Sequence, residues 1–168
     1  HVREANGHGH WAASIASDPF GSNTAYFESL LSKGYAGVVN WPSCILLEGH
    51  TLEEFSTIPA TPAAEYAYLA EARGAGLQTR AFFLTPEHAD AAIAAGLEDL
   101  VLHPGILLDV DTEGREMVLR AHSSIVAAIK ASNPKITVMI YTSDWHEDLL
   151  GLSRIECDGF LNFIGAKA

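Results

Sequence analysis

The sequence predicts an α/β fold built on a parallel sheet. Six short apolar runs have the length and the boundaries of β-strands, and helical patterns separate most of them. Glycines recur shortly before several runs, which is typical of the loops that lead from a helix into the next strand. The runs lie too far apart for hairpins, so right-handed parallel crossovers are favoured.

The predicted elements alternate along the chain. Strands are predicted at residues 11–17, 35–41, 78–84, 99–103, 135–141 and 158–164. Helices are predicted at residues 23–32, 62–73, 86–95, 113–131 and 144–152. Thr61 and Thr85 stand directly before Pro62 and Pro86, so each threonine is expected to cap a helix whose first residue is proline.

Six strand-helix units suit two architectures. One is an open, doubly wound parallel sheet, and the other is most of a (β/α)8 barrel. A complete barrel usually needs eight strands and more than about 200 residues, so the pattern alone slightly favours the open sheet. Few residues and no predicted helix follow the last strand, so we expect something else to cover its apolar surface.

Composition limits the class of protein. The 168 residues are expected to form a flexible leader at residues 1–10 and a single α/β domain at residues 11–168. The net charge of −11 argues against nucleic acids and anionic membranes as partners. No apolar stretch approaches the roughly 20 residues that span a bilayer. Two distant cysteines, Cys44 and Cys157, do not indicate a disulfide framework, so we expect a cytoplasmic protein.

The candidate site residues follow the predicted strands, because α/β folds bind ligands at the carboxyl ends of their strands. These residues are Asp18, Asn40, Ser43, His103 and Gly165. A carboxylate, an amide and an imidazole at one edge would suit acid/base or metal-assisted chemistry on an oxygen-rich substrate. Each also has a structural interpretation, since Asp18 can close a turn and a buried Asn40 needs partners whatever its function.

Two further charged residues have equally open interpretations. Glu65 stands in the first turn of a predicted helix, where a carboxylate complements the helix dipole without any catalytic role. Arg80 interrupts an apolar strand and would bind an anion or pair with a structural carboxylate. The sequence has no nucleophile elbow, dinucleotide fingerprint, Walker loop or C-x-x-C pair, so those enzyme classes lack their motifs.

One run is more specific than the single strand ends. Residues 34–43 read G-Y-A-G-V-V-N-W-P-S and are similar to a G-F-x-G-V-x-N-F-P-T run of a known family. Further matching stretches keep their order and spacing from about residue 12 to 166, at residues 18–20, 47–49, 52–54, 75–79, 94–96, 100–105, 159–160 and 165–166 and at Glu65. On these stretches the chain resembles the phosphoenolpyruvate hydrolase-like TIM-barrel family.

The resemblance implies an incomplete or divergent (β/α)8 TIM-like barrel, with the six strands in the places of the third to eighth. It also implies hydrolysis or carbon-carbon cleavage of a small oxo-acid, enol-phosphate or carbonyl compound, with Mg²⁺ or another divalent metal as a candidate cofactor. After the seventh strand the family has a glycine-rich run, and this chain has residues 141–144, Y-T-S-D, in its place. A glycine-rich phosphate loop is therefore not expected there.

Each candidate residue receives an expected role from this interpretation. His103 is expected to act as the acid/base, and Asp18 and Glu65 to act catalytically by binding a metal or as a base. Asn40 is expected to orient a substrate oxygen. The remaining expected substrate-binding residues are Ser43, Arg80 and Gly165.

The alternative is a non-catalytic module that binds a small molecule or assembles with other proteins on a retained barrel scaffold. In either case we expect a small-molecule ligand. Because open barrel edges favour association, we also expect a homo-oligomer or a partner chain that completes the barrel.

Overall fold

The computed structural model describes residues 2–3, 9–15, 22–47, 51, 53–54, 60–106, 111–143, 146–147 and 150–162. Its strands form one seven-stranded sheet whose spatial order follows the chain, from β1 to β7. β1 pairs with β2 in antiparallel fashion, and every later pair is parallel. The parallel sheet predicted from the sequence is thus confirmed.

The elements alternate as the sequence predicts. The strands are β1 (Val2–Arg3), β2 (His10–Ser14), β3 (Tyr35–Asn40), β4 (Gln78–Phe83), β5 (Asp99–Leu102), β6 (Thr137–Tyr141) and β7 (Gly159–Leu161). The helices are α1 (Asn23–Ser32), α3 (Pro62–Gly74), α4 (Pro86–Ala94) and α5 (Thr112–Ser132), with short 3-10 turns η1 (Cys44–Leu46) and η2 (Leu152–Arg154).

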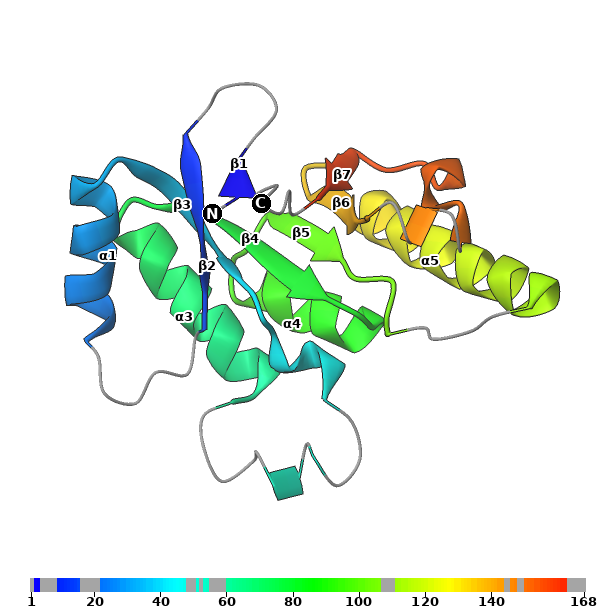
Figure 1. Cartoon of the computed structure of the whole chain (residues 1–168), viewed down its shortest axis with the longest axis horizontal. Coiled ribbons are helices and arrows are strands. Elements are labelled where there is room, and N and C mark those ends of the chain that lie inside the picture. Colours follow the sequence, from blue (N-terminus) through cyan, green and yellow to red (C-terminus); the bar gives the residue numbers. More distant parts are fainter. Residues whose placement is uncertain are drawn as a thin grey trace, which may run out of the picture.

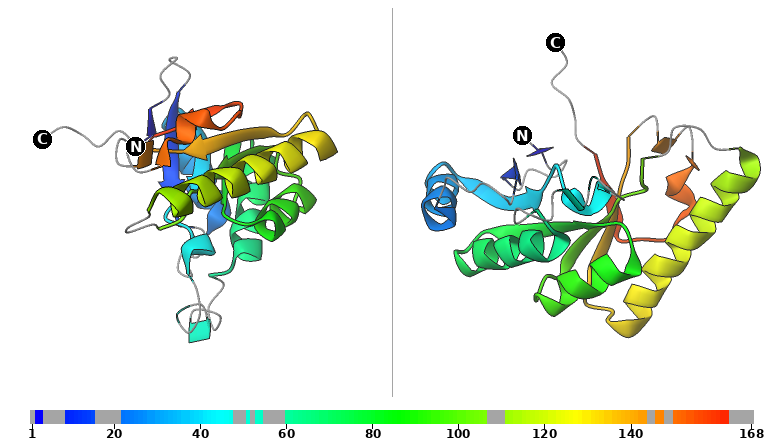
Figure 2. Two further views of the ribbon diagram at one scale, coloured as in Figure 1. Left: turned by 90° about the vertical axis from the view of Figure 1, so that its right-hand side faces the viewer. Right: turned by 90° about the horizontal axis from the view of Figure 1, so that it is seen from below.

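The sheet is curled into a half-barrel with its helices on the convex side (Figures 1 and 2). A doubly wound sheet reverses its strand order and places helices on both faces. Here the order never reverses, and α1, α3, α4 and α5 all lie on one side. The barrel expectation is therefore confirmed, and the open doubly wound alternative is wrong.

Most boundaries agree with the predicted ones, and the caps explain why. Thr61 accepts a hydrogen bond from the backbone N–H of Ala64, and Thr85 accepts one from that of His88, as threonine caps do. β1 was not predicted, because its two residues lie in the expected leader. Whether that leader is separate from the domain stays a prediction.

Side-chain alternation divides the core into two layers. Between the sheet and the helices lies the outer core, to which β3 contributes Val38 and β4 contributes Ala81 and Phe83. The concave side carries a smaller inner core that includes Trp11, Val39 and Phe82 with Ile45, Val101 and Leu161. Residues two apart on a strand share a face, so this division decides which strand-end residues can meet.

Gly37 on β3 leaves room for the large Trp11 side chain against the inner face of the sheet. A Cβ atom at Gly37 would lie 2.6 Å from the carbonyl oxygen of Gln78 and 2.7 Å from Cζ3 of Trp11. The first of these neighbours is backbone and the second belongs to a side chain that is 1% exposed, so neither has room to move. Glycine is required at this position because of close approach.

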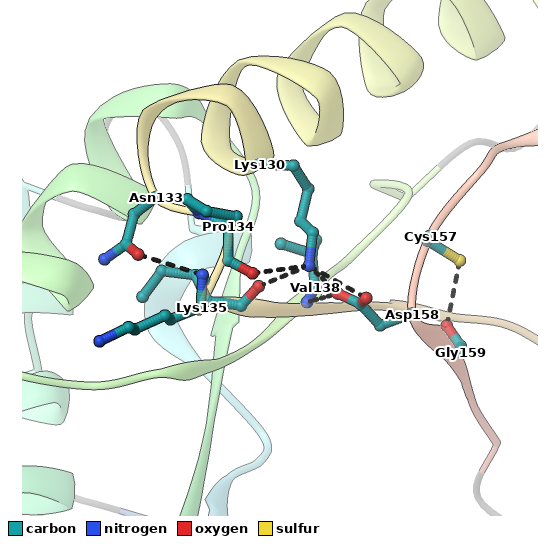
Figure 3. A network of polar contacts seen from close by, with 9 residues as sticks. Lys130, Asn133, Pro134, Lys135, Val138, Cys157, Asp158 and Gly159 are labelled. Carbon is teal, nitrogen blue, oxygen red and sulfur yellow. Dashed lines mark hydrogen bonds and ion pairs between the residues drawn. The ribbon is translucent and has the colours of Figure 1, made fainter.

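A polar contact joins β6 and β7 at their amino ends (Figure 3). Lys130 on α5 donates to both carboxylate oxygens of Asp158, at 2.9 and 3.0 Å, and to the carbonyl oxygen of Ile136. Asp158 also accepts from the backbone N–H of Val138 at 2.7 Å. That N–H and the Lys130 ammonium lower the pKa of Asp158 below its ordinary value. This contact fixes the end of the sheet opposite to the candidate site.

Among the helices that the structure describes, none combines the length and the apolarity of a bilayer-spanning segment. The expected cytoplasmic location stays a prediction.

Replacing Gly37 by alanine should lower the free energy of unfolding by about 1 to 3 kcal/mol, because the new methyl group overpacks the contact between β3, Trp11 and Gln78. Gly74→Ala is the matched control. A Cβ there meets nothing within 4 Å, and alanine is the better helix former, so stability should be unchanged or slightly raised. Urea unfolding of both variants measures the difference, and equal midpoints would contradict this account of Gly37.

Candidate active site

The sheet brings the carboxyl ends of β3, β4, β5 and β6 side by side, and three of the predicted site residues, Asn40, Ser43 and His103, stand at or shortly after the ends of β3 and β5. The predicted site residues within the described part of the chain form three groups. Asn40, Ser43 and Glu65 meet on the helix side of the sheet. His103 lies among aromatic rings on the concave side, and Arg80 lies on the same side, closer to the amino ends of the strands.

The first group is a closed set of hydrogen bonds, called here the Asn40–Glu65 network. Asn40 Nδ2 donates to Glu65 Oε2 at 2.7 Å, and Ser43 Oγ donates to the same oxygen at 2.5 Å. The backbone N–H of Cys44 donates to Glu65 Oε1 at 2.8 Å. Asn40, Ser43 and Glu65 are 0, 7 and 5% exposed. Both carboxylate oxygens are therefore engaged inside the protein.

Strand alternation explains why this network faces the helices. Asn40 shares a face with Val38 of the outer core, and Glu65 stands in the first turn of α3, which packs on that face. Ser43 caps η1 by accepting from the backbone N–H of Ile45. The network thus ties β3, the turn after it and α3 together. The expected roles of Glu65 in catalysis and of Asn40 and Ser43 in substrate binding stay predictions.

The surroundings of Glu65 do not fit a divalent cation. Its carboxylate is approached by an amide N–H, a hydroxyl and a backbone N–H, all of which present positive hydrogen atoms. A cation needs additional oxygen or nitrogen lone pairs in that place. Among the residues that the structure describes, no group of three His, Cys, Asp or Glu side chains could hold a metal. Asp18, the second expected ligand, lies outside the described residues.

The second group is the ring cluster of Trp41, Phe82, His103 and Tyr141. Trp41 and His103 directly follow β3 and β5, Phe82 is the last residue but one of β4, and Tyr141 is the last residue of β6. The ring centroids of Trp41, His103 and Tyr141 lie 5.0 to 5.6 Å apart, and Phe82 lies 4.8 to 6.0 Å from each of them. Three nearly equal distances describe a triangle, so His103 is not sandwiched between the other two rings. Phe82 forms the fully buried base of the cluster.

The Asn40–Glu65 network and the ring cluster share Phe82. The backbone N–H of Phe82 donates to Asn40 Oδ1 at 2.7 Å, and its carbonyl oxygen accepts from the Tyr66 hydroxyl at 3.1 Å. Trp41, which directly follows Asn40, packs on the Phe82 ring. The helix-side network therefore fixes two of the rings against which His103 packs.

His103 is 3% exposed and held at both ends. Its backbone N–H donates to the carbonyl oxygen of Phe83, and its Nδ1 accepts a hydrogen bond from the backbone N–H of Gly105 at 3.0 Å. Burial lowers the pKa of His103 to about 4, with smaller contributions from the imidazoles of His146 and His122. His103 is therefore a neutral imidazole at physiological pH.

His146 is a further imidazole beside the ring cluster, from the segment after β6. Its ring lies edge-on to Tyr141 at 5.5 Å and to His103 at 6.1 Å. Its Nδ1 shares a 2.9 Å hydrogen bond with the Ser143 hydroxyl, and burial lowers its pKa. His146 was not among the predicted site residues, because no sequence pattern places a residue of the segment after β6 beside a strand end.

Arg80 forms the third group. Its guanidinium lies over the Trp11 ring, 4.1 Å from the centroid, in a cation–π contact. Arg80 precedes Phe82 by two residues on the same face, so it lies one side-chain layer closer to the amino ends of the strands than the ring cluster. Its expected role as an anion ligand stays a prediction, as does that of Gly165, which lies outside the described residues.

The sequence contains a signal for the ring cluster, although its aromatic residues were not among the predicted site residues. Trp41, His103 and Tyr141 are the last residues of predicted strands, and Phe82 stands two residues before the end of another. Alternation from the inner-core residues Val39 and Val101 places Trp41 and His103 on the concave face. Checking every strand end for a ring on that face would have found the ring cluster.

Two tomato proteins are similar to part of this chain. They are the Solanum lycopersicum ToMV resistance protein Tm-1 and ToMV susceptible protein tm-1, each 30% identical over 95 residues. The match covers 56% of this chain and 13% of each tomato protein. The chain therefore spans a small part of the curated relatives that it matches.

Solved TIM-barrel enzymes share the fold. Dihydrodipicolinate synthase from Acinetobacter baumannii, solved with pyruvate, matches with a TM-score of 0.61 at 13% identity over 95% of this chain and 56% of the enzyme. A sialic acid aldolase from Ruminococcus gnavus matches with a TM-score of 0.57 at 15% identity over 97% of this chain and 56% of that chain. At these identities the likeness shows the fold alone.

The family model described as phosphoenolpyruvate hydrolase-like matches residues 9–166, nearly the whole chain. This span includes the Asn40–Glu65 network, the ring cluster and the curled sheet that carries them. The chain belongs to the phosphoenolpyruvate hydrolase-like family.

Proposed function

We propose that this chain carries the substrate-binding wall of a lyase or hydrolase that cleaves a C–C or C–O bond in a small oxo-acid or carbonyl compound. The observation that carries the proposal is the ring cluster, which presents a buried, neutral His103 at the carboxyl ends of four parallel strands. Barrel enzymes hold their substrates at this end. Family membership supports the reaction class.

Complexes of two structural neighbours with pyruvate support an oxo-acid as the substrate class. Two structural neighbours, the Acinetobacter baumannii synthase and the Escherichia coli protein YagE, were solved with pyruvate, which is a small oxo-acid. Arg80 offers a charge for a substrate carboxylate. The indole N–H of the adjacent Trp11 is buried without a hydrogen-bond acceptor in the described part of the chain, which favours an anion near this pair.

In the proposed reaction the catalytic group is an imidazole, that of His103, and not a lysine amine. The Ruminococcus gnavus aldolase is described as having a catalytic lysine. Of this chain's lysines, the described ones lie away from the concave face. Lys33 follows α1, Lys130 pairs with Asp158, and Lys135 stands in the turn before β6. Within the described residues, an imine with the substrate therefore lacks its amine.

A second candidate function is a binding or assembly module without turnover. Two observations favour it: both carboxylate oxygens of Glu65 are engaged within the fold, and the matching tomato proteins are named for ToMV resistance and susceptibility. Binding of an oxo-acid without turnover, with and without Mg²⁺, would support this candidate over the enzyme.

Replacing His103 by alanine should lower turnover of the best oxo-acid substrate by at least about 100-fold, because the ring presents the polar group nearest the proposed reaction. The measurement is a turnover screen of small oxo-acids and enol esters, with circular dichroism to show that the variant folds. His88→Ala on α4 is the control and should keep its activity. Unchanged turnover in His103→Ala would remove His103 from the mechanism.

We also propose that a second copy or a partner chain pairs with the open edges of the half-barrel. Among the described residues, β2 pairs with β1 only at Trp11 and His10, and β7 pairs with no strand other than β6. Ile15 and Phe160, next to these edges, are 60 and 46% exposed. Light scattering should show an oligomer that Ile15→Lys or Phe160→Lys weakens, because a lysine at an edge opposes strand pairing. A strictly monodisperse wild-type monomer would contradict this.

A further inference from the structure

The hydrogen bond between Gly105 and His103 fixes where the imidazole carries its proton. A backbone N–H can only donate, so Nδ1 of His103 must present its lone pair to Gly105 at 3.0 Å. The neutral ring then carries its hydrogen on Nε2. A proton acceptor at Nε2 would require the opposite tautomer and the loss of the Gly105 bond.

The turn after β5 is built to keep this bond. Gly105 has φ +91°, a left-handed conformation that residues with side chains rarely adopt. Pro104 separates it from His103, and the backbone N–H of His103 is bound to Phe83. The hydrogen bonds that hold His103, from the Gly105 N–H to its Nδ1 and from its own N–H to Phe83, therefore both involve backbone groups of fixed geometry.

The surroundings of His103 on balance favour the neutral ring, although the groups that face it act in opposite directions. They are Trp41 from the end of β3, Phe82 from β4, Tyr141 from β6 and His146 from the segment after it, while His122 on α5 acts at longer range. The aromatic faces attract an imidazolium weakly. Burial at 3% exposure, the two imidazoles and the Gly105 N–H oppose it.

We propose that His103 acts as a fixed hydrogen-bond donor through Nε2–H to the carbonyl or carboxylate oxygen of an oxo-acid, and not as the acceptor of a proton. This inference rests on the proposed lyase or hydrolase function. The hydrogen bond strengthens as negative charge develops on that oxygen during bond cleavage, which is how a preorganised neutral donor stabilises a transition state. The acid/base role expected from the sequence then falls to another group.

The first test is independent of substrate. Long-range ¹H–¹⁵N NMR of protein labelled at histidine reports which ring nitrogen carries the hydrogen, and the His103 signals are assigned by their loss in His103→Gln. The expected result is hydrogen on Nε2 and a bare Nδ1 from pH 5 to pH 9. A hydrogen on Nδ1, or an imidazolium at pH 7, would overturn the proposal even if the chain proves to be an enzyme.

Gly105→Ala tests the cause of the tautomer. Alanine is strained at φ +91°, so the turn should shift and weaken the hydrogen bond to Nδ1. The Nδ1 signal of His103 should then move toward a mixture of tautomers. If the tautomer stays fixed after the Gly105 contact is lost, the bond is not what sets it.

Ligand and rate measurements test the donor role. Titration with pyruvate should shift the His103 Nε2–H signal, and its failure to respond to any oxo-acid would count against the donor role. Glutamine places an amide N–H near the position of Nε2, whereas asparagine places one near Nδ1. His103→Gln should therefore keep at least 10-fold more turnover than His103→Asn or His103→Ala. Equal losses in all three variants of an active enzyme would overturn the donor role.

If no oxo-acid is turned over, the proposed lyase or hydrolase function is wrong. The NMR measurements are independent of turnover, so they still show which nitrogen of His103 carries the hydrogen and whether pyruvate contacts it.

Discussion

The side-chain amide of Asn40 takes the place of one backbone hydrogen bond between β3 and β4 and joins the sheet to the helix layer. Where β3 stops pairing with β4, Asn40 Oδ1 accepts the backbone N–H of Phe82, and Nδ2 of the same amide donates to Glu65. The orientation of the amide is fixed because each end meets a partner of only one kind. A buried donor left without an acceptor costs about 1 to 3 kcal/mol, so the arrangement is strongly specified. The ring cluster depends on it through Phe82 and Trp41.

Because the ring cluster depends on the Asn40–Glu65 network, the two faces of the sheet have different roles. On the helix side, Glu65 gathers the donors of β3 and of the turn after it, and it serves the fold. On the concave side, the strand ends present rings with His103 among them. Burial of the Cys44 thiol, with a smaller contribution from the adjacent Glu65 carboxylate, raises the pKa of that thiol far above its ordinary value, which makes Cys44 an unreactive core residue. The proposed chemistry therefore lies on the concave side.

Much of the fold followed from local signals, because those signals act over a few residues. Proline after threonine set the starts of α3 and α4, and glycine set several helix ends. The choice between barrel and open sheet did not follow from the periodicity of the sequence, since both architectures have the same alternation of strands and helices. Only the unreversed strand order and the single helix layer separate them.

The site was harder to predict for a different reason. Their places at strand ends made Asn40 and His103 candidates, but position along the chain does not say which face a side chain occupies after packing. Asn40 turned to the helices and His103 to the concave side, so the expected single cluster became two. The contact of His146 with Tyr141 and the tautomer of His103 depend on loop geometry that no short pattern encodes.

The central claim is that the Asn40–Glu65 network positions the rings around His103. The most direct measurement is the NMR spectrum of the His103 ring in Glu65→Gln. One amide oxygen cannot serve both Asn40 Nδ2 and the Cys44 N–H, so the network must rearrange. Glu71→Gln on the same helix is the control, because the Glu71 carboxylate accepts from Asn23 and has no part in the Asn40–Glu65 network. The account predicts that the ring-current shifts of His103 change in Glu65→Gln and not in Glu71→Gln. Identical His103 spectra in both variants and the wild type would contradict it.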